Sequence, residues 1–161
     1  MPIVKHVYIP ISKEYRKIKG LSERQIRKRL ESQGWIVWRG GYLHALRKQE
    51  IYPNIRKKYT ILKNLIDAEK LEYLQYLSKT HHGMPDFLCY RNSFKFVECK
   101  LGHEQLSVVQ KKCIKILVNK GYDVEIHKFV YGCTKDRIAY IDIETGDKSV
   151  KERQMRMKIN W

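Results

Sequence analysis

Two carboxylates and one lysine stand close together in the middle of the sequence. Asp86 follows a Gly-Met-Pro sequence, and Glu98 and Lys100 end the apolar segment that begins at Phe94. Alternate residues of a strand share one face, so Glu98 and Lys100 would extend the apolar face of this segment. A charged side chain on such a face is costly to bury without a partner. The pattern therefore predicts that the two residues act together at the end of a strand.

The residues between Asp86 and Lys100 are typical of a β-hairpin. An apolar strand follows Asp86, a polar turn comes next, and the second strand ends at Lys100. Antiparallel pairing of the two strands would place Asp86 beside Glu98 and Lys100, at the outer end of the hairpin. Carboxylate oxygens are the ligands that hard divalent cations prefer. The sequence therefore predicts a cation site at this end of a sheet.

The overall charge indicates a polyanionic partner. The 161 residues, which suit one domain, include 33 Lys and Arg but only 17 Asp and Glu, for a net charge of +16. This excess is larger than solubility requires, and nucleic acid is the partner that we expect first. An anionic membrane surface is the second candidate, because no predicted helix has a strongly basic face opposite a bulky apolar one.

The sequence does not predict a membrane protein or a disulfide framework. No apolar run approaches the roughly 20 residues of a membrane span, and the first residues do not form a signal peptide. The cysteines show no closely spaced pairs; they are Cys89, Cys99, Cys113 and Cys133. We expect buried, reduced thiols in a cytoplasmic protein rather than a zinc site or disulfides.

Several segments before the hairpin have predictable structure. The sequence Ser22 to Gln25 resembles a capping box, and the helix that it starts would end near Ser32. A short strand would follow at residues 35–39, ending in the flexible Gly40–Gly41 pair. Residues 42–80 have apolar residues at helical spacing and predict an inserted helix or helical pair. Residues 1–20 predict a short strand or an arm leading into the domain.

The segments after the hairpin are predicted as follows. A helix would run from Glu104 to about Lys120 and be closed by Gly121, with an apolar stripe of Leu106, Val109, Cys113, Ile114 and Leu117. Strands are expected at residues 123–130 and 137–143. The last residues, from about 145 to 161, carry many basic side chains and predict a tail or a final helix.

This order of elements resembles a known nuclease fold. Pro85–Asp86, a hairpin and then Glu98-x-Lys100 resemble the motif of the PD-(D/E)XK nuclease superfamily, and in particular the virus-type replication-repair (VRR-NUC) nucleases and the archaeal Holliday-junction resolvases. The resemblance implies an α/β, restriction-endonuclease-like αβββαβ core with a mixed central sheet flanked by helices. This core would occupy residues 21–41 and 81–130 of a single domain spanning 1–161, with residues 42–80 as a helical insertion.

The resemblance also implies roles for individual residues. Glu23 lies in the first helix, just before a Gly-aromatic strand, where relatives have a metal-site glutamate. Gln110 matches a glutamine of the helix after the hairpin. The implied catalytic residues are Glu23, Asp86, Glu98, Lys100 and Gln110, and the implied ligands of Mg²⁺ (or Mn²⁺) are Asp86, Glu98, Glu23 and the backbone carbonyl of Cys99. The implied activity is hydrolysis of DNA phosphodiester bonds by an endonuclease, and the resolvase relatives imply a homodimer.

Basic residues outside the motif are candidates for DNA contacts. Arg39 matches a position at which resolvase-like relatives contact the DNA backbone. The run Arg56, Lys57 and Lys58 lies near the start of the insertion, and Lys111 follows Gln110. Such a run is often only a solvated helix face, but the net charge favours phosphate contacts.

Less specific interpretations fit the same residues. Glu23 is also a first-turn acid of the kind that the helix dipole favours, and Gln110 is also explained as a hydrogen-bonded core glutamine. A basic DNA-binding protein without activity would use Asp86, Glu98 and Lys100 as a structural ion-pair cluster. An RNA-directed module with stacking tyrosines is the third alternative.

Overall fold

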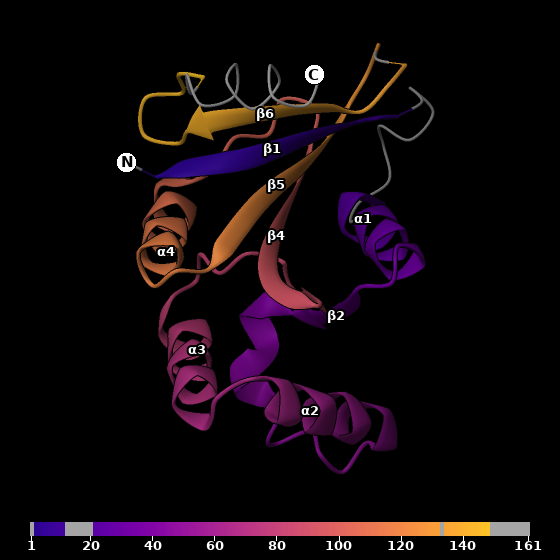
Figure 1. Ribbon diagram of the computed structural model, residues 1–161, viewed down its shortest axis with the longest axis vertical. Helices are drawn as coiled ribbons and strands as arrows, with labels where there is room; N and C mark the ends of the chain where they lie inside the picture. Colours follow the sequence, from indigo (N-terminus) through magenta and orange to yellow (C-terminus); the bar gives the residue numbers. More distant parts are fainter. Residues whose placement is uncertain (1, 12–20, 133, 149–161) are drawn as a thin grey trace.

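The fold is one six-stranded mixed sheet with helices on both faces. The computed structural model describes residues 2–11, 21–132 and 134–148 (Figure 1). The strands are β1 (Ile3–Pro10), β2 (Ile36–Arg39), β3 (Phe87–Arg91), β4 (Ser93–Leu101), β5 (Asp123–Val130) and β6 (Arg137–Asp142). The helices are α1 (Leu21–Ser32), the 3-10 helix η2 (Gly40–Ala45), α2 (Pro53–Leu65), α3 (Ala68–Thr80) and α4 (Val108–Asn119).

The predicted α/β core is confirmed. The elements α1, β2, β3, β4, α4 and β5 follow one another in the expected order, with the helical insertion between β2 and β3. The strand order in the sheet is β2-β3-β4-β5-β1-β6. The β2–β3 and β3–β4 pairs are antiparallel, whereas β4 and β5 run parallel and are connected through α4.

The N-terminal strand has a more central place than expected. β1 lies between β5, to which it is parallel, and β6, to which it is antiparallel (Figure 1). Its alternate residues are buried on both faces: Val4 belongs to one core cluster, and Val7 and Ile9 belong to the other. A strand covered on both faces is part of the sheet rather than an arm.

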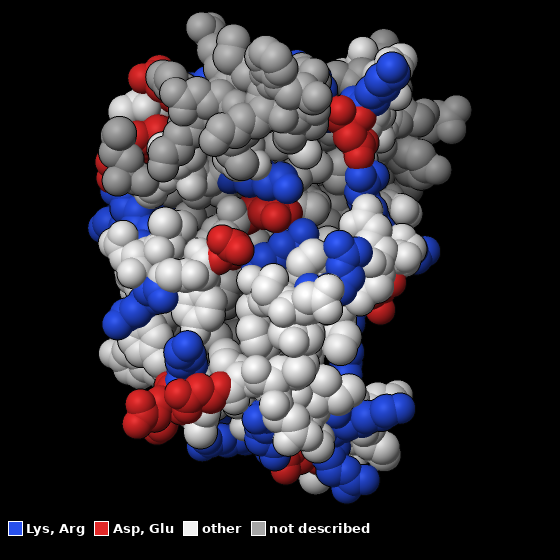
Figure 2. Space-filling view, viewed as in Figure 1, with Lys and Arg blue, Asp and Glu red and all other residues white. Residues whose placement is uncertain are grey.

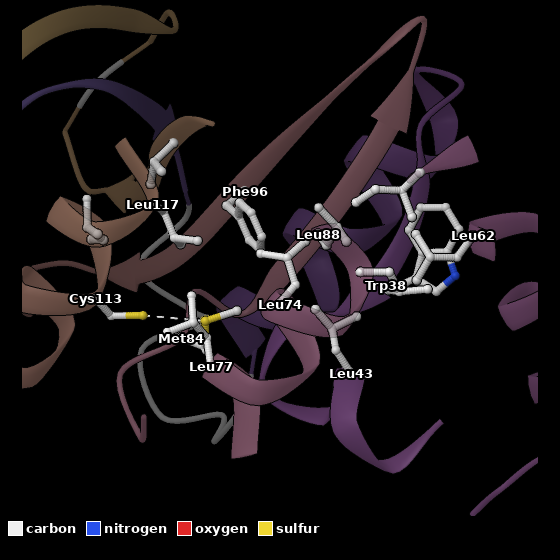
Figure 3. Packing of buried hydrophobic residues seen from close by; sticks show 14 of the residues in the cluster. Trp38, Leu43, Leu62, Leu74, Leu77, Met84, Leu88, Phe96, Cys113 and Leu117 are labelled. Carbon is white, nitrogen blue, oxygen red and sulfur yellow. Dashed lines mark hydrogen bonds between the residues drawn. The ribbon is translucent and has the colours of Figure 1, made fainter. Parts of the chain in front are cut away.

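The two faces of the sheet carry different cores. On one face, Phe96 and Leu88 pack with side chains of α3 and α4, and Cys113 Sγ lies 3.4 Å from Met84 Sδ (Figure 3). On the other face, α1 contributes Ile26 and Leu30. The three described cysteines are buried free thiols, as expected, and Cys133 lies outside the described residues.

The insertion covers the outer edge of the sheet. β2 is an edge strand, and its Val37 carbonyl accepts a hydrogen bond from Lys58 Nζ of α2. In return, Trp38 Nε1 donates to the Lys58 carbonyl over 3.0 Å. These bonds satisfy backbone groups that an open edge would expose. Tyr59 and Leu62 of α2 are buried in the same core as the sheet.

Two predicted helix starts differ from the structure. α1 begins at Leu21, so Ser22 lies inside its first turn rather than at an N-cap. α4 begins at Val108 instead of Glu104, and the capping box is found there, between Ser107 and Gln110. Val109 is 46% exposed and does not join the buried stripe. The expected closure by Gly121 is present, at a φ of 92° that glycine readily adopts.

The basic C-terminal extension falls mostly outside the described part of the chain, which ends at residue 148. Within the described residues, every helix is too short or too polar to span a bilayer.

Candidate active site

Asp86 lies directly before β3, where the chain enters the sheet. In the β3–β4 ladder Phe87 is opposite Val97, so the position before Phe87 is level with Glu98. Asp86 Oδ2 accepts a hydrogen bond of 2.8 Å from the backbone N–H of Cys99. The half-buried Asp86 carboxylate is therefore held at the middle residue of the Glu98-x-Lys100 sequence.

Two glycines position the backbone around Asp86. Gly40 donates its N–H to the Asp86 carbonyl over 2.8 Å, and a Cβ on Gly40 would lie 2.1 Å from the Pro85 carbonyl oxygen. A Cβ on Gly83 would lie 2.4 Å from the carbonyl oxygen of Val109, in the first turn of α4. The turn that carries Asp86 thus fits tightly between the end of β2 and the start of α4.

Glu98, Lys100 and Gln110 form a connected polar group. Glu98 and Lys100 are only 3% and 8% exposed, on the same face of β4. Lys100 Nζ donates to Gln110 Oε1 over 3.0 Å, and Gln110 Nε2 donates to Glu98 Oε1 over 3.4 Å. Gln110 Oε1 also accepts from the Ser107 N–H over 2.9 Å. The capping box of α4 therefore fixes the side chain that joins Glu98 to Lys100.

Glu23 reaches this group from α1, on the opposite layer. Burial, followed by the nearby charge of Asp86, raises the pKa of the Glu23 carboxyl, and Arg39 opposes that effect. Burial also raises the pKa of Glu98 to about 9, again with Asp86 contributing and Lys100 opposing. The three carboxyl groups are thus close enough to disfavour one another's ionisation.

The oxygen donors of this arrangement are of the kind that would suit a divalent cation. Glu98 Oε2 is buried without a hydrogen-bond partner in the described part of the chain. A cation would satisfy this atom and relieve the repulsion with Asp86. Among the described residues, no three His, Cys, Asp or Glu side chains form a complete metal-holding group. Two carboxylates that leave room for water and phosphate oxygens are the usual protein contribution to a Mg²⁺ site.

Comparison with known families identifies the domain. Residues 19–129 match the VRR-NUC domain, over more than half of the chain. This protein belongs to the VRR-NUC family. VRR-NUC domains are nuclease domains of the PD-(D/E)XK type, so the predicted resemblance is confirmed. Searches of curated proteins and of solved structures gave no significant match.

Basic residues lie around the candidate site of this VRR-NUC domain. Figure 2 shows one face of the molecule, on which Lys and Arg side chains lie around a few acidic ones, in keeping with the net charge of +16. Arg39 is exposed at the end of β2, with its guanidinium 4.7 Å from the centre of the Tyr42 ring. Arg56 and Lys57 are exposed on α2, whereas Lys58 is half-buried against β2. Lys111 lines a cavity of about 330 Å³ beside Lys100.

The sequence prediction missed two residues that lie at the candidate site. Lys128 of β5 is in register with Lys100 and lines the same cavity. The sequence did contain an indication of Lys128. It follows Val124 and Ile126 at the same two-residue spacing, so it occupies a position of the strand at which an apolar residue is expected. Ser107 is the second; the spacing Ser107-x-x-Gln110 is the same capping pattern that was assigned to Ser22.

Proposed function

We propose that this protein is a metal-dependent deoxyribonuclease that hydrolyses phosphodiester bonds within DNA chains. The observation that carries the proposal is the convergence of Asp86 and Glu98, from separate strands, beside a lysine that is held by Gln110. The family supports nuclease activity, and the net charge of +16 supports a nucleic acid substrate. Glu98 Oε2 is buried without a hydrogen-bond partner in the described part of the chain, which favours a bound cation over a purely structural cluster.

Asp86 and Glu98 would hold Mg²⁺, or Mn²⁺ in its place. Glu23 and the backbone carbonyl of Cys99 are the further oxygen donors of the proposed site. All-oxygen donors favour these ions over zinc. When bound, the ion supplies an activated water and neutralises charge on the phosphate and the leaving oxygen.

Lys100 and Gln110 would act on the attacking water and the phosphate. The Lys100 ammonium, 3.0 Å from Gln110 Oε1, has further donor protons that can hold the water and stabilise the charge developing on the phosphoryl oxygens. Gln110 would keep Lys100 and Glu98 at a fixed separation. Because these hydrogen bonds would hold both side chains in place, the proposed site would need little rearrangement on binding substrate.

Basic residues would deliver the DNA, since a cluster of acids alone repels it. Arg39 is near Glu23, and Lys111 is near Lys100; in this proposal both would contact phosphates that flank the scissile bond. Arg56 and Lys57 would extend the contact along the insertion. We also propose a reducing, cytoplasmic location, which the buried free thiols support, and a homodimer, which light scattering would test.

The decisive experiment is cleavage of end-labelled linear, flapped and branched DNAs by the wild type and by Asp86→Asn, in Mg²⁺, Mn²⁺ or EDTA. We expect metal-dependent internal cuts by the wild type alone, while Asp86→Asn still binds. Salt-sensitive binding without cleavage of any substrate by the wild type would instead identify a non-catalytic DNA-binding protein.

A further inference from the structure

A second hollow lies beside the candidate site, where the insertion meets the core. It has a volume of about 360 Å³, and its walls combine apolar and cationic side chains. The apolar part is made by Trp38, Leu46 and Ile55, and the other walls include Arg27, Arg39, Tyr42 and Lys58. We call this hollow the insertion groove.

The insertion groove adjoins a cavity that contains Glu23 of the candidate site. A smaller cavity of about 250 Å³ is lined by Glu23, Phe87, Arg27 and Arg39. The two arginines line both cavities, and Phe87 is the residue after Asp86. A chain that leaves the candidate site along α1 would therefore enter the insertion groove next.

The exposed edge of the groove offers a ring for stacking. Tyr42 is 53% exposed, whereas Trp38 is 3% exposed and contributes only to the apolar floor. The Arg39 guanidinium lies 4.7 Å from the Tyr42 ring centre, which adds a planar cation to the same surface. Aromatic and guanidinium planes are the surfaces on which proteins stack unpaired bases.

The charges select for an anionic occupant. The charge of Arg27 is partly neutralised, because its Nε donates a hydrogen bond to Glu31 over 3.1 Å. The ammonium of Lys58 is already engaged, because it donates a hydrogen bond to the Val37 carbonyl. Arg39 lines the groove, has no acidic partner within ion-pair distance among the described residues, and interacts with the nearby charge of Glu23. An apolar wall beside exposed positive charge fits a ligand with a flat base and a phosphate.

We propose that the insertion groove binds an unpaired nucleotide in a single-stranded arm next to the cleavage site. The bases of an intact duplex are stacked on one another and cannot enter a side groove. The preferred substrate is therefore duplex DNA that ends in a single-stranded arm at the site. This inference rests on the proposed function only in taking DNA as the ligand, and it does not require cleavage.

The test is binding by fluorescence anisotropy in EDTA, with the full chain. Two labelled probes are compared: a blunt duplex of about 20 base pairs, and the same duplex with a single-stranded arm of about five nucleotides, within the range of known single-strand sites. We expect the wild type to bind the armed probe more tightly. Tyr42→Ala should weaken that binding by about fivefold to a hundredfold, the range for loss of one stacked base. Its effect on the blunt probe should stay within about twofold.

Tyr76→Ala is the matched control. Tyr76 is 61% exposed on α3 and does not line the groove, so this variant should keep the wild-type preference. Equal binding of the two probes by the wild type, or equal weakening of both by Tyr42→Ala, would overturn the proposal.

A second measurement does not depend on a variant. An arm that carries 5-iodouracil should photocross-link to the tryptic peptide 40–47, which contains Tyr42. Cross-links confined to peptides that contribute no residue to the groove would contradict the proposal. If no DNA is cleaved under any condition, the proposed function fails, yet both binding measurements still test the groove.

Discussion

The carboxylate of Asp86 accepts a hydrogen bond from the backbone N–H of Cys99 over 2.8 Å. Cys99 lies between Glu98 and Lys100, so this single bond ties the loop before β3 to the end of β4. It fixes both the orientation of Asp86 and its distance from the other acidic group. The same side chain is therefore expected to serve the fold and the chemistry.

Two substitutions at position 86 separate these roles. Asp86→Asn keeps an oxygen acceptor for the Cys99 N–H, whereas Asp86→Ala leaves that donor unpaired; both remove the repulsion with Glu98. We expect both variants to lose at least about a hundredfold in cleavage rate. Urea denaturation should show that Asp86→Ala is about 1–2 kcal/mol less stable than Asp86→Asn. Equal stability of the two variants would contradict a structural role for the bond.

Gly40 and Gly41 provide a matched pair. A Cβ on Gly40 would lie 2.1 Å from the Pro85 carbonyl oxygen, so the backbone beside Asp86 must move in Gly40→Ala. We expect a loss of about 1–3 kcal/mol in the free energy of unfolding and a cleavage rate at least about tenfold lower. A Cβ on Gly41 meets nothing within 4 Å, so Gly41→Ala should stay within about 0.5 kcal/mol of the wild type. Similar behaviour of the two variants would argue against close packing at Gly40.

The hairpin and the helix that carries Gln110 could be predicted, because local sequence patterns describe them. The spacing from Asp86 to Glu98 and Lys100 defines a hairpin whose register follows from its short turn, so the convergence of these residues could be expected. The inward position of Gln110 was predictable, because its amide lies among the apolar residues of an amphipathic helix. Its partner Ser107 was missed, since the helix was started at Glu104 instead of at the cap.

The remaining features depend on contacts between distant segments. The alternation of β1 does not reveal that it lies between β5 and β6, because its partners are more than a hundred residues away. The insertion groove likewise joins Arg27, from α1, to Tyr42 and Ile55 of the insertion. A local sequence pattern cannot predict that these residues lie together, because their proximity depends on how α2 packs over the edge of β2.

The link between Lys100 and Glu98 should depend on Gln110. Gln110→Glu replaces the Nε2 donor with a carboxylate oxygen that faces Glu98, so we expect it to lower the cleavage rate by at least about tenfold. Ser107→Ala removes the cap hydroxyl but leaves both functional ends of Gln110. It should lower the unfolding free energy by about 1 kcal/mol with a smaller effect on the rate. Steady-state kinetics and urea denaturation of the two variants test this contrast; equal rates would exclude a positioning role for Gln110.

Acid stability should depend on a network away from the site. Burial by itself would raise the pKa of Glu125, but its hydrogen bond with His127 (2.9 Å) and the ammonium of Lys95 (3.0 Å) outweigh burial and lower the pKa to about 2.

Because this folded-state pKa is below the unfolded value of 4.5, the stabilisation is present above pH 4.5 and is lost as the pH falls toward 2. The loss should reach about 3 kcal/mol, from about 1.4 kcal/mol per pKa unit. Urea denaturation between pH 5 and 2.5 (about the range of this titration) should therefore show a flatter pH dependence for Glu125→Gln than for the wild type. Parallel curves would show that Glu125 is not held by these partners.

Replacing the three consecutive basic residues of α2 by neutral ones should have different effects on DNA binding and on stability. Arg56 and Lys57 are exposed, and as phosphate contacts each would add about 0.9 to the slope of log affinity against log salt concentration. The double variant Arg56→Gln, Lys57→Gln should therefore bind DNA more weakly, with a slope reduced by about 1.8, at nearly unchanged stability. Lys58→Met instead removes the donor to the Val37 carbonyl at the edge of β2, and it should lower the unfolding free energy by about 1–2 kcal/mol. Salt titrations of binding and urea denaturation measure both effects. If the slope of the double variant is unchanged, Arg56 and Lys57 do not contact phosphates and are only part of a solvated helix face. If the slope changes more in Lys58→Met than in the double variant, Lys58 is the phosphate contact instead.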